Sequence, residues 1–464
     1  MIIIFVVLYG LKSSFWFGIN DLYKNTMKTF IFFSKKFELW VLSFLMFFTF
    51  FAVNKLTLFI VVLVLFIIIF KRNFFLKNTK TIGIKPILFL CSWYLFSIIT
   101  FFWSENTGDY TKIVIRDSAF LIFPVLIIYG IDFLSKKRIE FLLYIFILGV
   151  LIQLFIFYIG LNDGVNHSTN ENLSIFNFYS NFNRFLKYTP NELLGLYKWQ
   201  VDRPFLHIHK AYLSIQCLIG IVFLLYKLPK LSSKSVLLLL FSVFLVFNGV
   251  IVFLFSIPNL ILLFLFYFVF IVRFLKKRPL LTFAFLSVFI TSIVYYSTTG
   301  SGEKYISFQT KKITNLISTI KNQSNLIEYN KFNNSRLRSY YCAVTSIKKR
   351  PFFGYGLGDT KDVLVDCYEE KIFLTEFKER HNTHNYYLDR LLSGGFVMLF
   401  LFLLFFVYCY KIGFQKKSKL YLLFLTIFLV NLLFENVFSR VQGIFTFSIL
   451  NSLFLNFLIK KPES

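Results

Sequence analysis

Long apolar runs, separated by short clusters of lysine and arginine, recur along the 464 residues of the chain. Each run covers about 15 to 22 residues, which as a helix is long enough to cross a hydrocarbon layer of roughly 30 Å. We place about twelve such spans. Those of the first half are Leu39 to Val53, Leu56 to Phe70, Pro86 to Phe102, Ser118 to Leu134, Phe141 to Gly160 and Ala211 to Tyr226. Those of the second half are Ser235 to Phe255, Asn259 to Leu275, Pro279 to Ser297, Leu388 to Tyr410, Leu420 to Phe434 and Val441 to Ile459. The pattern predicts an all-α polytopic integral membrane protein with a single membrane domain over residues 1–464.

The basic clusters between the spans predict the orientation of the chain. They all fall on one side of the predicted membrane, which the positive-inside tendency makes cytoplasmic, and both termini are expected there. The clusters are Lys71 with Arg72, Lys136 to Arg138, Lys227 with Lys230 and Lys234, Lys276 to Arg278, Lys416 with Lys417 and Lys419, and Lys460 with Lys461.

The composition agrees with a membrane protein. It is 57% hydrophobic and 16% charged, whereas soluble domains hold roughly 45–50% apolar and 25% charged residues. The formal net charge of +27 does not require a nucleic-acid partner, because cationic anchors facing anionic headgroups account for much of it. Residues Met1 to Leu11 form an apolar run that has no basic start or small-residue cleavage site and is too short to span, so no cleavable signal is expected. Because Met27 is followed by KTFIFFSKKF, a normal cytoplasmic lead-in to the first span, Met27 is an alternative start, with the first 26 residues an over-called extension.

Two predicted outside loops are long, 161–210 and 298–387, and loops held by a rigid scaffold are where function concentrates. The second loop holds 14 Lys and Arg against 9 Asp and Glu. One interpretation of this surplus is an ordinary solvated surface. The other is attraction of a polyanionic or pyrophosphate-bearing partner.

The large loop carries its own structural signals. Arg336, Tyr340, Val344 and Ile347 have helical spacing up to Pro351, which predicts an amphipathic helix on the membrane surface. A second such pattern is formed by Ile313, Leu316, Ile317 and Ile320. The segment GYGLG at Gly354 to Gly358 lacks the lysine and the strand-to-helix context of a phosphate loop and is expected to be a turn. Cys342 and Cys367 could form a disulfide in an oxidising compartment, whereas the other three cysteines lie in spans.

All five histidines, His167, His207, His209, His381 and His384, fall in or beside the two outside loops. One hypothesis is that histidines simply avoid lipid. The other is that one of them is a general base, since imidazole titrates nearest neutral pH. His384 is the strongest candidate, because it stands beside Asn385 at the start of a long apolar helix. A metal site formed by the pairs His207/His209 and His381/His384 is disfavoured, because it lacks cysteine or carboxylate support, so no metal and no cofactor are expected.

Three arginines are candidates for binding a diphosphate. Arg203 precedes a span, and Arg336 and Arg338 share the predicted surface helix. Planar guanidinium groups converging from two loops would grip such an anion bidentately. The alternative is that an arginine near a span end only reaches toward lipid headgroups. Glu435 and Arg440 are interpreted as an interfacial ion pair without a chemical role.

The order of these residues resembles the O-antigen ligase and Wzy-type O-antigen polymerase superfamily. The resemblance rests on Arg336 with an aromatic residue at Tyr340, on IKKRPFFGYGLG at Ile347 to Gly358, and on HNYYL at His384 to Leu388 with Gly394 and Gly395. It covers about 60 residues. The sequence departs from the family in having Tyr340 at the position of a tryptophan, and FSIPN at Phe255 to Asn259 where the family often has Ser-Arg.

The resemblance implies a multi-pass enzyme of the bacterial inner membrane that moves a glycan from undecaprenyl pyrophosphate to an acceptor hydroxyl in the periplasm, without metal and with inversion. In that family the histidine of the HN dipeptide is the base, which corresponds to His384. The diphosphate-binding arginines correspond to Arg336, with Arg338 beside it, and more loosely to Arg203. Asn385, His209 and Tyr340 are supporting candidates.

The acceptor is the point that the residues leave open. A ligase acting on lipid A core is the first expectation. A polymerase that extends a growing glycan and a protein O-oligosaccharyltransferase are alternatives. A flippase or secondary transporter would also have about twelve spans, but it should carry ionisable or Gly/Pro-broken sites at mid-membrane, of which the sequence shows few.

Overall fold

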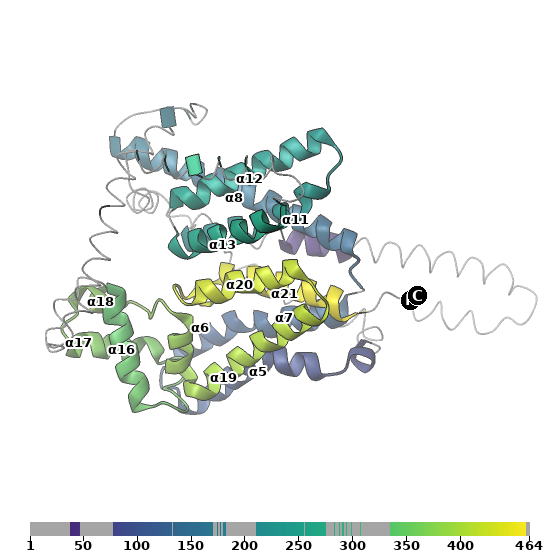
Figure 1. Ribbon diagram of the computed structural model, residues 1–464. Helices are drawn as coiled ribbons and strands as arrows, with labels where there is room; N and C mark the ends of the chain where they lie inside the picture. The colour runs from purple at the N-terminus through teal and green to yellow at the C-terminus, as the bar shows by residue number, and fades with distance from the viewer. Residues whose placement is uncertain are drawn as a thin grey trace, which may run out of the picture.

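The computed structural model describes residues 38–46, 78–131, 133–169, 210–254, 256–274 and 335–460, with isolated positions between 174 and 307. Within these residues the chain forms helices and no strands, which confirms the all-α class for this part. Figure 1 shows the helices as one bundle with a smaller group of helices across one end. In chain order the labelled elements are α5 (Lys85–Ile99), η1 (Thr100–Trp103), α6 (Thr107–Asp117), α7 (Ala119–Pro124), η2 (Val125–Gly130), α8 (Lys136–Thr169), α11 (Lys210–Lys227), η4 (Leu228–Lys230), α12 (Lys234–Leu254), α13 (Ile257–Phe274), α16 (Ser335–Lys349), α17 (Thr360–Glu370), α18 (Leu374–Glu379), α19 (Tyr386–Gln415), α20 (Lys419–Leu432), η7 (Val437–Ser439) and α21 (Val441–Ile459).

Seven helical stretches among the described residues are long and apolar enough to cross a membrane: Lys85–Trp103, Thr107–Gly130, Lys136–Asp163, Lys210–Lys227, Lys234–Leu254, Tyr386–Gln415 and Val441–Ile459. Two shorter apolar helices, Ile257–Val269 and Lys419–Leu432, occupy the places of two further predicted spans. The chain is therefore a multi-pass membrane protein by its helices. The predicted spans Leu56 to Phe70 and, for the most part, Pro279 to Ser297 lie outside the described residues, as does the end of Leu39 to Val53, so the number twelve stays a prediction.

One predicted span has a different start. The stretch expected at Ser118 to Leu134 begins at Thr107 and ends at Gly130. The sequence did not indicate this extension, because the charged residues Arg116 and Asp117 interrupt the apolar pattern. In the fold they form an ion pair of 2.8 Å, with Asp117 fully buried, so the polar segment continues into the bundle.

The most enclosed helix of the bundle is α21, whose spanning stretch is 89% buried. Its Phe447 packs against rings from the surrounding helices, including Phe405 and Phe406 of α19 and Phe424 and Phe428 of α20. Aromatic pairs at such offset and edge-on angles add to the area that they bury. This aromatic centre holds α19, α20 and α21 against one another, and the candidate site is built where α19 and α21 begin and α20 ends.

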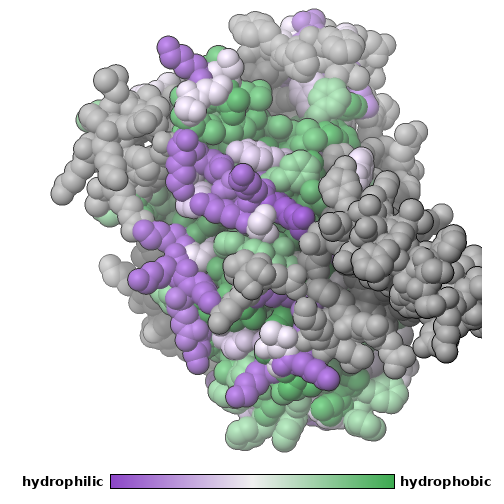
Figure 2. Space-filling view, turned by 90° about the vertical axis from the view of Figure 1, so that its right-hand side faces the viewer, coloured by the Kyte–Doolittle hydropathy of each residue, from purple (hydrophilic) through white to green (hydrophobic). Residues whose placement is uncertain are grey.

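The described basic clusters gather at one end of the bundle, as the sequence predicts. They lie where α8 and α12 begin and where α11, α19 and α21 end, and the Lys227 ammonium is 2.8 Å from Glu140 Oε2 there. Figure 2 looks onto this face and shows hydrophilic residues across it, with hydrophobic surface around them. We refer to it as the basic end.

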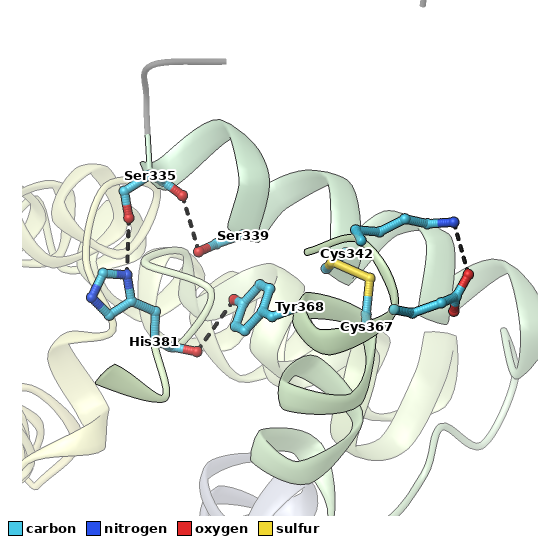
Figure 3. The surroundings of a disulfide bond; sticks show 8 residues. Ser335, Ser339, Cys342, Cys367, Tyr368 and His381 are labelled. Atoms are coloured by element: carbon cyan, nitrogen blue, oxygen red, sulfur yellow. Dashed lines mark hydrogen bonds and ion pairs between the residues drawn. A yellow bond between two sulfur atoms is a disulfide. The ribbon is translucent and has the colours of Figure 1, made fainter. Parts of the chain in front are cut away.

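The helices α16, α17 and α18 form a lobe across the opposite end, and Figure 1 shows α16 at right angles to the spans. The helix predicted from Arg336 to Arg350 is confirmed as α16 (Ser335–Lys349). A disulfide between Cys342 and Cys367 joins α16 to α17 and is drawn in Figure 3. The second predicted surface helix, at Ile313 to Ile320, lies outside the described residues.

The lobe is attached to the bundle through a break in α19. Gly394 and Gly395 have non-helical backbone angles inside this helix. The turn after α16 uses the break: the Tyr355 amide donates to the Leu392 carbonyl at 2.8 Å, and the Phe396 amide donates to the Pro351 carbonyl at 2.8 Å. The expected turn at GYGLG is confirmed, and its role is to pair backbone to backbone with the broken helix.

Candidate active site

His384 lies two residues before the start of α19, in a left-handed backbone conformation (φ 47°). Its amide donates to Asn382 Oδ1 at 2.9 Å. The next residue, Asn385, caps the helix, because its side-chain oxygen accepts from the amides of Tyr387 and Leu388 at 3.0 and 3.2 Å. In the HN dipeptide, Asn385 therefore fixes the start of α19, and this places the His384 imidazole beside the N-terminal end of the helix.

Glu435, in the turn between α20 and η7, brings two of the predicted site residues together. Its Oε1 lies 3.4 Å from His384 Nδ1, and its Oε2 lies 3.6 Å from Arg336 Nη2. The carboxylate side chain is 19% exposed, so these charges interact in a partly desolvated place. The sequence-based interpretation, which paired Glu435 with Arg440 and gave it no chemistry, missed these contacts. The turn near a span end was visible in the sequence, but its partners lie far along the chain.

Arg336 occupies the first turn of α16, and its side chain is 44% exposed. Tyr340 follows one turn later and is half-buried. Burial raises the pKa of the Tyr340 hydroxyl, while the neighbouring Arg336 charge opposes that rise. The hydroxyl therefore stays protonated near neutral pH and is a donor beside the guanidinium.

Arg338 lies on a different side of α16. Its Nη1 is 3.2 Å from Oε2 of Glu376, a carboxylate that is 1% exposed, and its guanidinium lies 5.3 Å from the ring of Phe373. These contacts tie α16 to α18 and neutralise a buried charge. The geometry gives Arg338 a structural contact within the lobe, apart from the Arg336 and His384 cluster.

His381 joins the loop before α19 to the start of α16. Its Nδ1 is 2.9 Å from Ser335 Oγ, as Figure 3 shows, and its Nε2 is 2.6 Å from Glu379 Oε2. Tyr368 donates its hydroxyl to the His381 carbonyl at 3.2 Å, and burial raises the pKa of Tyr368 to about 12, which keeps it a donor. The rings of His381 and His384 meet edge to face at 5.8 Å. Two imidazoles therefore line this end of the bundle, each with a carboxylate partner.

Beneath this surface lies a buried group of four charges that sequence reasoning did not single out. Arg390 is 2% exposed and contacts Asp389 at 2.6 Å and Asp117 at 3.9 Å. Asp117 in turn pairs with Arg116. The sequence does contain a signal for this group, because Arg-Asp and Asp-Arg dipeptides stand at the edges of apolar runs. Charges in such places are costly unless they are paired, so the dipeptides indicate buried ion pairs.

A chain of hydrogen bonds connects the buried charges to the His384 loop. Asn436, next to Glu435, donates to Asp389 Oδ1 at 3.5 Å and to Thr383 Oγ1 at 3.1 Å. Thr383 precedes His384 and donates to the Asn385 carbonyl at 2.8 Å. The two turns that carry His384 and Glu435 are thereby held to each other and to the core.

Several predicted site residues lie outside the described residues: Arg203, His207 and His209. His167 falls in α8, but its side chain is not described. Among the described residues, no group of three His, Cys, Asp or Glu side chains is arranged to hold a metal ion. The metal site considered for His207, His209, His381 and His384 is therefore untested.

The arrangement of Arg336, Tyr340, Glu435 and His384 can bind an anion and move a proton. Arg336 offers charge-assisted donors, and Tyr340 offers a hydroxyl one helical turn away. His384 can accept a proton through Nε2 when Nδ1 donates to Glu435.

Residues 236–403 match a family model described as O-Antigen ligase. The match runs from α12 to α19 and includes Arg336, Arg338, Tyr340 and His384, whereas Glu435 lies beyond it. It confirms the resemblance to the O-antigen ligase and Wzy-type polymerase superfamily, whose members are membrane glycosyltransferases. A comparison with curated proteins gave no match.

Proposed function

We propose that the protein is an inverting glycosyltransferase of the bacterial inner membrane, and that it transfers a glycan from undecaprenyl pyrophosphate to lipid A core in the periplasm. The contact of one carboxylate, Glu435, with both Arg336 and His384 is the observation that carries this proposal. It joins an anion-binding group and a candidate base, which come from separate segments, at the end of the bundle opposite the basic clusters.

His384 acts on the acceptor hydroxyl. Its Nδ1 donates to Glu435, which leaves Nε2 to take the proton as the hydroxyl oxygen attacks the anomeric carbon of the glycan. The Nδ1 to Oε1 distance of 3.4 Å is long for a hydrogen bond, and catalytic contacts of this kind commonly shorten when substrate is bound. The carboxylate stabilises the imidazolium that forms.

Arg336 acts on the leaving group. As the new glycosidic bond forms, the bond from the anomeric carbon to the diphosphate oxygen breaks, and the electron pair stays on the diphosphate. The guanidinium binds that developing charge, with Tyr340 as a further donor and Arg203 as a second cation from the other loop. A single displacement inverts the anomeric configuration, and a product that retains it would contradict this mechanism.

A deletion strain tests the function and separates the acceptors. For a ligase, the cells lose long glycan chains from lipid A while free lipid-linked polymer accumulates. Single repeat units on the core would instead indicate a polymerase. Loss of protein glycosylation alone would indicate an oligosaccharyltransferase. Complementation with the wild type and with His384→Ala tests the base in the same strain.

A further inference from the structure

An exposed group of three cations and two aromatic rings lies where α16 ends. We call it the basic aromatic patch, and it consists of Lys348, Lys349, Arg350, Phe352 and Phe353. The three cations are exposed, and the two phenylalanines are 65% and 59% exposed. Because α16 has 15 residues and a helix rises 1.5 Å per residue, the patch lies roughly 20 Å from Arg336. It is thus separate from the candidate active site.

The patch lies at the level where the spans leave the apolar layer. The Phe353 ring meets Trp103 at 6.2 Å, and Trp103 is the last residue of the span Lys85–Trp103. Tryptophan at a span end is typical of the headgroup region. The Phe352 ring meets Phe396 of α19 at 6.3 Å, and Phe396 is itself 52% exposed.

The apolar side of the patch continues into surface that faces outward from the bundle. Phe101 and Phe102, beside Trp103, are 51% and 83% exposed. In a protein with these spans, such a surface is covered by acyl chains. The aromatic residues of the patch therefore stand at the boundary between acyl chains and headgroups, with the three cations directly adjacent in sequence.

The turn holds this arrangement rigidly. Its backbone pairs with the broken helix α19, and the Arg350 guanidinium rests over the Tyr355 ring at 5.0 Å. An added Cβ on Gly354 would collide with the Leu392 carbonyl, so the turn packs tightly on α19. The phenylalanines are presented outward because the backbone behind them is fixed.

Among the described residues, the charge of the patch is offset only in part by neighbours. Among the described residues, no carboxylate lies within ion-pair distance of Lys348, Lys349 or Arg350. The acidic group that faces Lys349 is Glu370, and it pairs with Lys371 at 2.7 Å. The orientation tendency of membrane proteins explains cations at the basic end, but not these, which lie at the other end of the bundle.

We infer that the basic aromatic patch binds an anionic phospholipid, with the headgroup phosphate on Lys348, Lys349 and Arg350 and an acyl chain along Phe352 and Phe353. The site is independent of the glycan reaction. It anchors the end of α16 to the bilayer, and the other end of the same helix carries Arg336.

Photocrosslinking tests the site directly. The purified protein is placed in phosphatidylcholine vesicles with a subsaturating amount of photoreactive phosphatidylglycerol, and the labelled peptides are mapped by mass spectrometry. We expect labelling of the peptide that contains Phe352 and Phe353. Each cation near an anionic headgroup contributes about fivefold in affinity, so the variant K348Q/K349Q/R350Q should lower this labelling by roughly a hundredfold. Labelling near Lys460, at the basic end, serves as the internal reference and should not change.

A matched variant removes the same charge from elsewhere on the lobe. Lys361, Lys378 and Arg380 lie on or beside α17 and α18, and K361Q/K378Q/R380Q should label like the wild type. The variant F352S/F353S should lose labelling by phosphatidylglycerol and by photoreactive phosphatidylcholine alike. Equal labelling of the wild type and K348Q/K349Q/R350Q would overturn the proposal, and so would an equal loss in the matched variant.

Discussion

Glu435 holds His384 across 51 residues of the chain, with its Oε1 at 3.4 Å from the imidazole Nδ1. The second oxygen of the same carboxylate faces Arg336 at 3.6 Å. The turn between α20 and η7 therefore connects the loop that carries the candidate base to the helix that carries the candidate anion-binding group. This relationship determines which ring nitrogen of His384 is left for substrate.

Replacing the carboxylate of Glu435 by an amide should slow transfer. In Glu435→Gln the amide can donate to Nδ1, which favours the wrong tautomer and removes the charge that stabilises the imidazolium. We expect kcat to fall by up to roughly 10⁴-fold, the loss found when an amide replaces the acid behind a catalytic histidine. The measurement is transfer from lipid-linked donor to acceptor by purified protein in vesicles.

Glu369→Gln is the matched control, because Glu369 is an exposed carboxylate of α17. It should transfer at the wild-type rate. If Glu435→Gln did the same, the carboxylate would have no part in orienting the base.

Loss of Arg390 should destabilise the whole bundle. Arg390→Met leaves Asp117 and Asp389 buried with one cation fewer, and breaking a buried pair in this way costs about 3–5 kcal/mol. The double variant D389N/R390M removes one of the stranded charges as well and should recover part of that loss. Thermal unfolding in detergent measures both, and equal stability of Arg390→Met and wild type would contradict the burial of this charge group.

The disulfide should stabilise the lobe that carries Arg336. Cys342 and Cys367 are separated by 25 residues, and a bond closing a loop of this size contributes roughly 3 kcal/mol. The variant C342S/C367S should therefore release the lobe to proteolysis at lower temperature. Reductant should reproduce this effect in the wild type and add nothing in the variant. An effect of reductant on the variant would point to a different cause.

The break in α19 should tolerate no side chain at Gly395. Its φ is +64°, and an added Cβ would collide with the Phe352 carbonyl, so Gly395→Ala should cost more than about 1 kcal/mol. Gly249 of α12 is the matched control, because nothing lies within 4 Å of an added Cβ at that position. Gly249→Ala should leave the free energy of unfolding unchanged or raise it by up to about 1 kcal/mol, since alanine favours the helix more than glycine does. Comparing the unfolding temperatures of the two variants tests the docking of the turn on α19.

Local pattern was sufficient to predict much of the fold. The spacing of Arg336, Tyr340, Val344 and Ile347 before Pro351 predicted α16, because an amphipathic helix and its end are encoded within a few turns. The span from Val441 to Ile459 was predicted for a similar reason, since a continuous apolar run between two basic or polar ends has few alternatives to a membrane-spanning helix. The disulfide was only an option in the sequence, because pairing depends on how α16 and α17 pack.

The candidate site was less predictable, because its contacts join distant segments. His384 could be singled out from its place before an apolar run, but nothing near it in sequence indicates Glu435. Likewise the dipeptides Arg116-Asp117 and Asp389-Arg390 show charges at span ends, but the pairing of Asp117 with Arg390 follows only from how α6 and α19 pack. The local sequence shows that such charges are present, but it does not indicate partners that lie far along the chain.

The transfer reaction of His384→Ala and Arg336→Ala, measured with donor concentration varied, tests the central claim most directly. His384→Ala should lower kcat by about 10²–10⁴-fold with little change in the KM for donor, because the base acts in the chemical step. Arg336→Ala should in addition raise the KM for donor, because the guanidinium binds the diphosphate. Normal transfer by His384→Ala would contradict the account.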